Sequence, residues 1–292
     1  MTLFRGAGVA IVTPFRNGMV DYPGLGQLID WQISQEIDAI IVCGTTGEAS
    51  TLNDEEHINT VRFTVEKTGG RIPVIAGAGS NDTAHAVFMS RELKDCGVDG
   101  LLLVTPYYNK CTQKGLIQHY TKIADEVDIP MILYSVAGRT GVNISPSTVF
   151  ELAKHPNIVG IKEASGNISQ VVEIAKCLDD EFALYSGNDD MIVPVLSVGG
   201  IGVISTVANI VPSDTHHMIM SYLDGDVKKA CRLQLEMKHL IDVMFVEVNP
   251  IPIKAALNLM GKIEMEYRLP LCPPEEKSLE LIRKELAEYG LI

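Results

Sequence analysis

The sequence lacks the features that mark membrane, disulfide-stabilised and metal-binding proteins. No apolar run reaches the roughly 18 residues that cross a bilayer. No basic segment followed by an apolar one opens the chain, so we predict no secretion signal. The six cysteines form no CxxC pair and keep no metal-type spacing to histidine. We therefore expect reduced thiols, no bound metal, no membrane association and a cytoplasmic location.

Basic residues are also scarce. The chain has 24 Lys and Arg against 37 Asp and Glu, a formal net charge of −13, and the acidic residues are scattered along it. A nucleic-acid partner would require a basic stripe, so the charge balance excludes that class. With 46% hydrophobic residues among 292, the chain has enough apolar material for a large core in one or two domains.

Short apolar runs recur along the chain with helical patterns between them. Such runs, in alternation with helices, indicate a parallel sheet covered on both faces. Eight of these units predict an α/β chain folded as a closed (β/α)8 TIM barrel. An open doubly wound sheet is the alternative, but no predicted strand is followed by GxGxxG and eight units are many for such a sheet. The predicted strands are Gly8–Phe15, Ala39–Gly44, Pro73–Gly79, Gly100–Pro106, Pro130–Val136, Val159–Ala164, Phe182–Gly187 and Gly200–Ser205.

Helices are predicted after each strand and throughout the last part of the chain. Asn53 is a suitable N-cap for the second helix, Gly97 is suited to follow the third, and Pro194 interrupts the seventh. We expect residues 1–224 to form the barrel and residues 225–292 to form a helical extension packed on it. The predicted helices are Leu25–Glu36, Asp54–Lys67, Asp82–Cys96, Gly115–Val127, Ser147–Lys154, Ser169–Leu178, Asp190–Val198, Pro212–Leu223, Asp226–Phe245, Pro252–Met260 and Pro274–Tyr289.

Lys162 is the most informative single residue. It ends the β-branched, apolar run Ile158–Ile161, which is typical of a buried strand. Burial disfavours the ammonium form of a lysine and leaves a fraction of free amine, which can attack a carbonyl carbon and form a Schiff base. The alternative is a lysine that extends to solvent or pairs with Glu163.

Polar residues at other strand ends favour the catalytic interpretation of Lys162. In a (β/α)8 barrel the active residues project from the C-terminal ends of the strands, so residues that follow different strands meet at one mouth. Five predicted strands end in polar or titratable side chains. The segments are Gly44-Thr-Thr-Gly-Glu48, Thr105-Pro-Tyr-Tyr-Asn109, Tyr134-Ser-Val-Ala-Gly-Arg139, Lys162-Glu163 and Tyr185-Ser-Gly-Asn-Asp189.

Three of these segments suggest specific chemistry. The hydroxyls and backbone N–H groups of Thr45 and Thr46 suit a small anion such as a carboxylate, although the segment could be a plain turn. The phenol of Tyr134 can transfer protons, or it can be an aromatic residue at the edge of the core. Arg139 suits bidentate capture of a carboxylate, or it can be a surface arginine.

Ordered motifs over nearly the whole chain resemble the dihydrodipicolinate synthase family, also called 4-hydroxy-tetrahydrodipicolinate synthases. The wider superfamily of pyruvate-dependent aldolases includes N-acetylneuraminate lyase and shares the barrel and the lysine. The paired threonines and Arg139 favour the synthase. Ser135 and Ala137 depart from the family pattern of asparagine and proline at these positions. The matching segments are Gly8-Val-Ala-Ile-Val-Thr-Pro14, Gly44-Thr-Thr-Gly-Glu48, Val104-Thr-Pro-Tyr-Tyr-Asn109, Tyr134, Gly138-Arg-Thr-Gly141, Gly160-Ile-Lys-Glu-Ala164, Asn249-Pro-Ile-Pro252 and Arg268-Leu-Pro-Leu271.

The resemblance implies a reaction. Lys162 would condense with pyruvate, and the resulting enamine would attack the aldehyde of L-aspartate 4-semialdehyde in the diaminopimelate route to lysine. No metal or organic cofactor is implied, and the expected assembly is a homotetramer, a dimer of dimers. The implied proton relay is Tyr134, Thr45 or Thr46, and Tyr108 from the neighbouring subunit. The implied substrate-binding residues are Thr46 and the backbone at Ile204 for pyruvate, Arg139 for the carboxylate of the semialdehyde, and Gly187.

Two other functions stay open at this point. The first is another pyruvate-dependent class I aldolase, such as a lyase that acts on a sugar acid. The second is a binding protein without turnover, which would be expected to lose Lys162 or Tyr134, and both are present.

The resemblance also implies a site for L-lysine at the dimer interface of feedback-sensitive members. Such members usually carry glutamate where this chain has His85, and often histidine where it has Asp54. A carboxylate at position 85 would pair with the ammonium group of the ligand, and histidine cannot. Asp54 would offset part of this loss if its side chain faced the ligand. We therefore predict weak or absent inhibition by lysine. The matching positions are Ala49, Ser50, Asp54, His57, Asn81, His85 and Tyr107.

Overall fold

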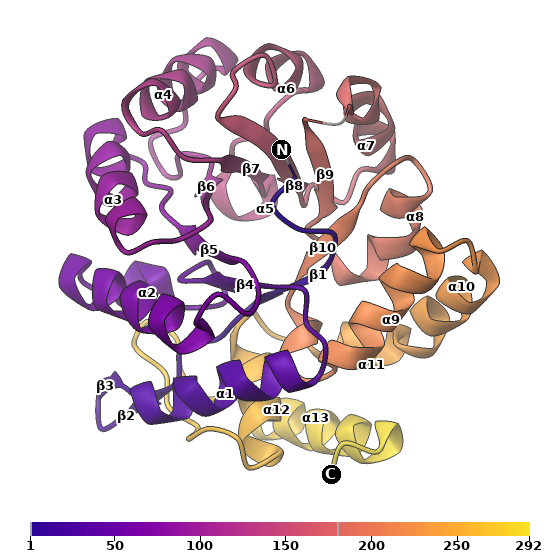
Figure 1. Ribbon diagram of the computed structural model, residues 1–292. Coiled ribbons are helices and arrows are strands. Elements are labelled where there is room, and N and C mark those ends of the chain that lie inside the picture. Colours follow the sequence, from indigo (N-terminus) through magenta and orange to yellow (C-terminus); the bar gives the residue numbers. More distant parts are fainter. Residues whose placement is uncertain (1, 180) are drawn as a thin grey trace.

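The computed structural model describes residues 2–179 and 181–292 and shows a closed parallel barrel ringed by helices (Figure 1). The order of strands around the barrel is β1-β10-β9-β8-β7-β6-β5-β4, so every predicted strand has a counterpart and the predicted (β/α)8 fold is confirmed. The strands are β1 (Gly6–Ala10), β4 (Ala39–Val42), β5 (Val74–Gly77), β6 (Gly100–Val104), β7 (Met131–Ser135), β8 (Ile158–Glu163), β9 (Ala183–Ser186) and β10 (Gly202–Ser205).

The helices of the barrel follow the predicted ones closely. Asn53 caps α2 as predicted, because its side chain accepts from the N–H of Glu56 while the Glu56 carboxylate accepts from the N–H of Asn53. Gly97 has a positive φ just after α3, as expected for a residue beyond a helix end. The helices are α1 (Tyr22–Ser34), α2 (Asp54–Thr68), α3 (Thr83–Asp95), α4 (Gln113–Glu126), α6 (Pro146–Leu152), α7 (Ile168–Ile174), α8 (Ile192–Leu196) and α9 (Pro212–Leu223).

Because successive side chains of a strand point to opposite faces, the core of the molecule has two layers. Side chains on one face of each strand pack inside the barrel, and those on the other face pack against the helices. At the N-terminal end the interior is closed by Phe4, whose ring stacks on Tyr185 with centroids 4.5 Å apart and whose carbonyl accepts from the Tyr185 hydroxyl. The N-terminal end of the barrel interior is therefore a packed core in the described part of the chain.

Three predicted elements were wrong in extent. The strand Gly8–Phe15 ends at Ala10, because Pro14 has no N–H to donate and the chain turns into a small hairpin, β2 (Phe15–Arg16) with β3 (Met19–Val20). The helix Asp226–Phe245 is interrupted at Met237, and the helix Asp190–Val198 shortens to α8, which holds Pro194 in its first turn.

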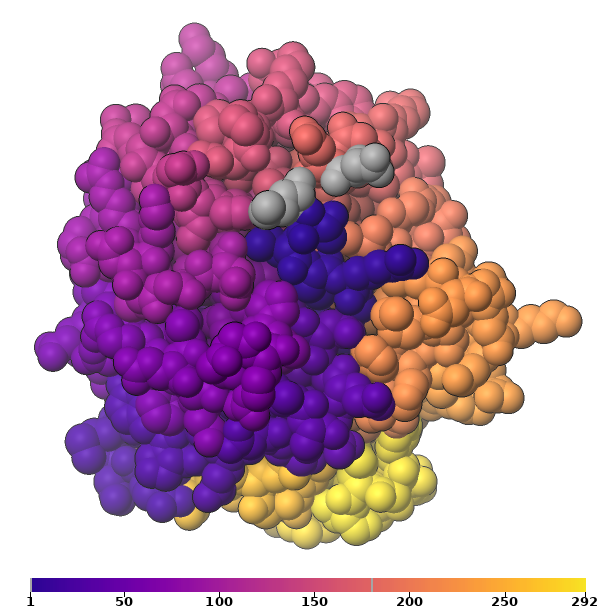
Figure 2. All heavy atoms as spheres, viewed as in Figure 1, coloured from indigo at the N-terminus to yellow at the C-terminus, as the bar shows by residue number. Residues whose placement is uncertain are grey.

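The C-terminal helices pack along one side of the barrel (Figures 1 and 2). They are α10 (Val227–Glu236), α11 (Lys238–Val243), α12 (Ile251–Leu259) and α13 (Glu276–Tyr289). Within the described residues, none of the helices is both long and apolar enough to cross a membrane.

A fully buried ion pair joins this helical extension to the barrel. The ammonium group of Lys254 on α12 contacts the carboxylate of Glu48, which follows β4, and both side chains are fully buried. Burial lowers the pKa of Lys254, and the Glu48 charge opposes that shift. Arg268 extends the contact, since its guanidinium donates to both carboxylate oxygens of Glu56 and to the carbonyl of Thr51. Removal of one partner would leave a buried charge unpaired, which costs about 3–5 kcal/mol.

Candidate active site

A cavity of about 290 Å³ lies at the C-terminal ends of the barrel strands. Its lining brings together residues that follow different strands, as the sequence predicted. The predicted site residues that line it are Thr45, Thr46, Tyr134, Arg139, Lys162 and Gly187.

An extra residue in β8 directs Lys162 into this cavity. The ladder between β7 and β8 pairs Met131 with Ile158 and then Ile132 with Gly160, so Val159 is left without a partner. Such a bulge exchanges the two faces of a strand from that point on, because side chains alternate with period two.

The bulge determines which side chains of β8 point into the barrel interior. Tyr134 packs with the barrel interior and Leu133 with the outer core, and their partners in the ladder are Lys162 and Ile161 respectively. Without the extra residue Ile161 would stand opposite Tyr134, and Lys162 would point toward the helices. Instead Lys162 is 6% exposed, and its Nζ lies 4.3 Å from the centroid of the Tyr134 ring.

Gly160 makes this packing possible. A Cβ atom at that position would lie 2.7 Å from the carbonyl oxygen of Ala183 on the adjacent strand β9. Real side chains do not approach a backbone oxygen so closely, so any larger residue must push β8 away from β9.

Two carboxylates flank Lys162 in different ways. Glu163 points away from the cavity and accepts from the Ser165 N–H and the Gln170 amide, and burial raises its pKa. Asp189 lines the cavity and accepts backbone N–H groups of Thr206 and Val207. Burial raises the pKa of Asp189, while its hydrogen bonds and the charge of Lys162 lower it.

The threonine loop after β4 is held in a strained conformation. Cys43 and Glu48, at its two ends, are non-glycine residues with φ of +52° and +54°. Strain of this kind persists where the surroundings impose it, often at functional sites. Inside the loop, Thr46 is 3% exposed and its Oγ1 accepts from the Asn249 amide at 2.9 Å.

Arg139 lies on a short helix that the sequence did not predict, α5 (Ala137–Thr140). Ala137, where the family has proline, is its first residue, and Gly141 ends it with φ of +71°. The Arg139 guanidinium lines the cavity and donates to the Asn249 carbonyl at 2.9 Å.

Two predicted site residues do not line the cavity. The Ile204 side chain packs in the barrel interior, and Thr206, two residues on, lines the cavity instead. Tyr108 is 93% exposed on the loop after β6, with φ of +71°. Within this subunit, therefore, Tyr108 does not reach Lys162.

The prediction missed the part of the site that comes from the C-terminal extension. Ile241, Asp242, Phe245 and Asn249 all line the cavity. Asn249 stands in the motif Asn249-Pro-Ile-Pro252, one of the segments that carry the family resemblance, and that motif was the available signal.

A second cavity of about 450 Å³ adjoins the first and shares Thr45, Tyr134 and Arg139 with it. Six of the seven positions predicted for the L-lysine site line this second cavity. They are Ala49, Ser50, Asp54, His57, His85 and Tyr107. The seventh, Asn81, is not among the lining residues, and its side chain donates to the Tyr107 carbonyl at 3.0 Å.

The polar groups of the second cavity are largely engaged with one another. His85 Nε2 lies 3.1 Å from the carboxylate of Asp54. Asp54 is the only acidic residue that lines the cavity within the described residues. Burial lowers the pKa of His57, so the ring is neutral near pH 7 and donates its Nε2–H to the Gly77 carbonyl at 2.9 Å.

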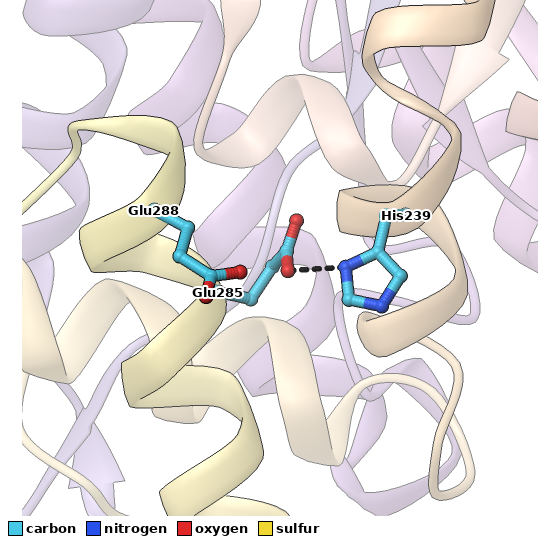
Figure 3. A group of neighbouring side chains, drawn as sticks. All are labelled: His239, Glu285 and Glu288. Carbon is cyan, nitrogen blue, oxygen red and sulfur yellow. Dashed lines mark hydrogen bonds and ion pairs between the residues drawn. The ribbon is translucent and has the colours of Figure 1, made fainter.

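One group of side chains of the kinds that bind metal ions lies close together in the described part of the chain. This group lies outside both cavities. His239 on α11 and Glu285 and Glu288 on α13 place ligand atoms within 4.8 Å of one another (Figure 3). Nδ1 of His239 is already hydrogen-bonded to Glu285, and Glu288 lies 3.6 Å from Lys284. We interpret the group as a contact that joins two helices.

Comparisons with known proteins agree with this geometry. Residues 3–289 match the model of the dihydrodipicolinate synthetase family. A protein of Thermoanaerobacter sp. (strain X514), named 4-hydroxy-tetrahydrodipicolinate synthase, is 54% identical over 100% of this chain and 99% of its own length. Among solved structures, a dihydrodipicolinate synthase from Acinetobacter baumannii complexed with pyruvate is 43% identical, with a TM-score of 0.97 over the full length of both chains. Another from Cyanidioschyzon merolae, with lysine bound, is 39% identical, with a TM-score of 0.97 over 100% of both chains.

The role of Gly160 generates a prediction. Gly160→Ala should lose about 1–3 kcal/mol of unfolding free energy, because the added methyl group must displace β8 or β9. It should also slow capture of Lys162 by pyruvate and borohydride, since Lys162 is two residues along the displaced strand. Urea denaturation and timed mass spectrometry would measure the two effects.

Gly138→Ala is the matched control, because a Cβ there meets no atom within 4 Å. This variant should keep both the stability and the capture rate. If the two alanine variants behave alike, close packing at Gly160 does not position Lys162.

Proposed function

The chain belongs to the dihydrodipicolinate synthetase family, a family of lyases, and we propose that it condenses pyruvate with L-aspartate 4-semialdehyde. This is the activity of a 4-hydroxy-tetrahydrodipicolinate synthase in diaminopimelate and lysine biosynthesis. We place the enzyme in the cytoplasm because all six cysteines are unpaired, as in other proteins of reducing compartments.

The observation that carries this proposal is the buried amine of Lys162 against the ring of Tyr134 in the cavity at the barrel mouth. In the proposed first step, Nζ of Lys162 attacks the ketone carbon of pyruvate and water leaves, which forms a Schiff base. Loss of a methyl proton then gives an enamine. Its carbon bonds to the aldehyde carbon of the semialdehyde, and ring closure through the amino group releases the lysine.

The remaining groups have roles in binding and proton transfer. Tyr134 and Thr45 would pass protons between substrate and solvent, because both line the cavity beside Lys162. The Thr46 hydroxyl and the backbone near Ile204 and Gly187 would hold the carboxylate of pyruvate. Support for a pyruvate site comes from the solved relative that contains pyruvate.

Arg139 would bind the carboxylate of the semialdehyde, and the size of the cavity fits two small substrates. A guanidinium pairs well with a carboxylate, and within the described residues the Arg139 guanidinium donates one hydrogen bond, to the Asn249 carbonyl. A volume of about 290 Å³ is at the low end for ligand pockets. This favours a three-carbon and a four-carbon substrate over the long sugar acid of the alternative aldolase function.

Tyr108 would complete the proton relay of a neighbouring subunit in a homotetramer. Tyr108 is 93% exposed and its backbone is strained, with φ of +71°, and within the described residues its side chain makes no hydrogen bond. Strain at an exposed aromatic residue is expected where a partner surface stabilises it. Tyr107 beside it is 41% exposed and lines the second cavity, so this loop lies at the edge of that cavity.

A direct assay tests the function. Wild-type enzyme should form product from pyruvate and L-aspartate 4-semialdehyde and should not cleave sialic-acid-type sugar acids. Arg139→Ala should raise the KM for the semialdehyde about ten- to hundredfold, the value of a charge-assisted contact, and should leave pyruvate adduct formation nearly unchanged. Absence of product with the semialdehyde, or an equal loss of adduct formation in the variant, would contradict this assignment.

The role of Tyr108 can be tested by subunit mixing. Tyr108→Phe and Lys162→Ala should each be nearly inactive, because each removes one group from every site. Mixed oligomers of the two should regain part of the wild-type rate, since some sites then hold an intact lysine and a neighbour's intact tyrosine. Mixed oligomers verified by native mass spectrometry that show no recovery would exclude sharing of Tyr108.

We further propose that L-lysine inhibits this enzyme weakly or not at all. Asp54 is the only acidic residue that lines the second cavity within the described residues, and its carboxylate already contacts the His85 ring. The ammonium group of a bound lysine would then lack a free carboxylate partner. Loss of one such pair in a partly buried site costs about 2–5 kcal/mol, or a few decades in affinity.

Initial rates against rising L-lysine at pH 7.5 would test the effector proposal. Wild type should keep most of its activity at millimolar lysine. His85→Glu should gain saturable inhibition, because a carboxylate returns to the cavity and Asp54 is released. Strong inhibition of wild type below about 1 mM would refute the proposal.

A further inference from the structure

Asn249 contacts two groups of the site at once, although it lies in the C-terminal extension. Its side-chain Nδ2 donates to Thr46 Oγ1 at 2.9 Å, and its backbone carbonyl accepts from Arg139 at 2.9 Å. Its side chain is 6% exposed and lines the cavity. It stands between α11 and α12, and its contact with Thr46 spans 203 residues of sequence.

The direction of the first hydrogen bond has a chemical consequence. An amide nitrogen can only donate, so Thr46 Oγ1 must accept from Asn249. The hydroxyl proton of Thr46 is then free to donate to another group. Within the described residues, Oγ1 of Thr46 takes part in no other hydrogen bond. A carboxylate in the cavity is a natural acceptor for that proton.

The loop that carries Thr46 is also fixed from behind by the same extension. Glu48, two residues after Thr46, is paired with the buried ammonium group of Lys254 on α12. Thr46 therefore has little freedom to move its backbone, and the orientation of its hydroxyl depends on the Asn249 amide. The other amide atom, Oδ1, is buried and has no hydrogen-bond partner in the described part of the chain.

The contact with Arg139 differs, because it uses the backbone carbonyl of Asn249. A change of side chain at position 249 leaves that acceptor in place. The two contacts can therefore be separated by mutation, with the first sensitive to the side chain and the second not.

We propose that Asn249 is a positioning residue, which orients the Thr46 hydroxyl so that it donates to the carboxylate of pyruvate. This inference rests on the proposed function, in which Thr46 binds that carboxylate. It predicts that the effect of Asn249 acts through Thr46, and that the semialdehyde step is affected little.

A double-mutant cycle tests this dependence. Asn249→Ala should lower the rate of pyruvate adduct formation, measured by borohydride trapping, about ten- to hundredfold. This factor corresponds to the loss of one buried hydrogen bond. In a Thr46→Val background the same change should cost less than about threefold, because the oriented hydroxyl is already absent. The KM for the semialdehyde should stay within about threefold of the wild-type value, since the acceptor for Arg139 is retained.

Asn258→Ala is the matched control. Asn258 lies on α12 of the same extension, and its amide donates to the Ile263 carbonyl at 2.9 Å, away from the cavity. This variant should leave the rate of adduct formation unchanged in both backgrounds. Circular dichroism and thermal unfolding would establish that each variant is folded, and Asn249→Ser, a smaller change in polarity, would replace Asn249→Ala if the latter does not fold.

Equal losses from Asn249→Ala in both backgrounds, or no loss in either, would overturn the proposal. A failure of the proposed function is distinguishable from this outcome. In that case wild-type enzyme would form no product from pyruvate and the semialdehyde, whatever the result of the cycle.

Discussion

One unpaired residue in β8 determines the chemistry of the whole cavity. Val159 has no partner in the ladder with β7, and from that point the strand presents the opposite set of side chains to the interior. Lys162 therefore faces Tyr134, and Ile161 faces the helices. Because period-two alternation is rigid, the same sequence without the bulge would place a hydrocarbon side chain where the amine now stands.

The cavity is completed by a segment remote in sequence. The barrel supplies the amine and the phenol, while the C-terminal extension supplies Asn249, which contacts both Thr46 and Arg139. The buried pair of Lys254 and Glu48 fixes the two parts relative to each other. Such a pair adds little net stability over an apolar contact, but it tolerates only one arrangement of its partners. The extension therefore contributes to the geometry of the site as well as to the core.

Much of this architecture could be predicted from the sequence. Apolar runs in alternation with helices indicated the barrel, because a strand covered on both faces has no polar side. The positions of Thr46, Arg139 and Lys162 at strand ends indicated a common mouth, since all parallel strands of a barrel end at the same face. These inferences depend only on local pattern and on the topology that follows from it.

The remainder depends on contacts that local pattern does not encode. The bulge at Val159 leaves no signature in a strand that is apolar throughout, so the direction of Lys162 could be predicted only from its chemistry. The role of Asn249 depends on a contact across 203 residues. The short helix that carries Arg139 has four residues, too few for a periodic pattern.

The most direct test of the role of Lys162 is to reduce the enzyme with borohydride in the presence of pyruvate and to map the modified peptide by mass spectrometry. One pyruvate-derived adduct is expected, on Lys162. An adduct on any other lysine, or none, would contradict the assignment of Lys162 as the reactive amine.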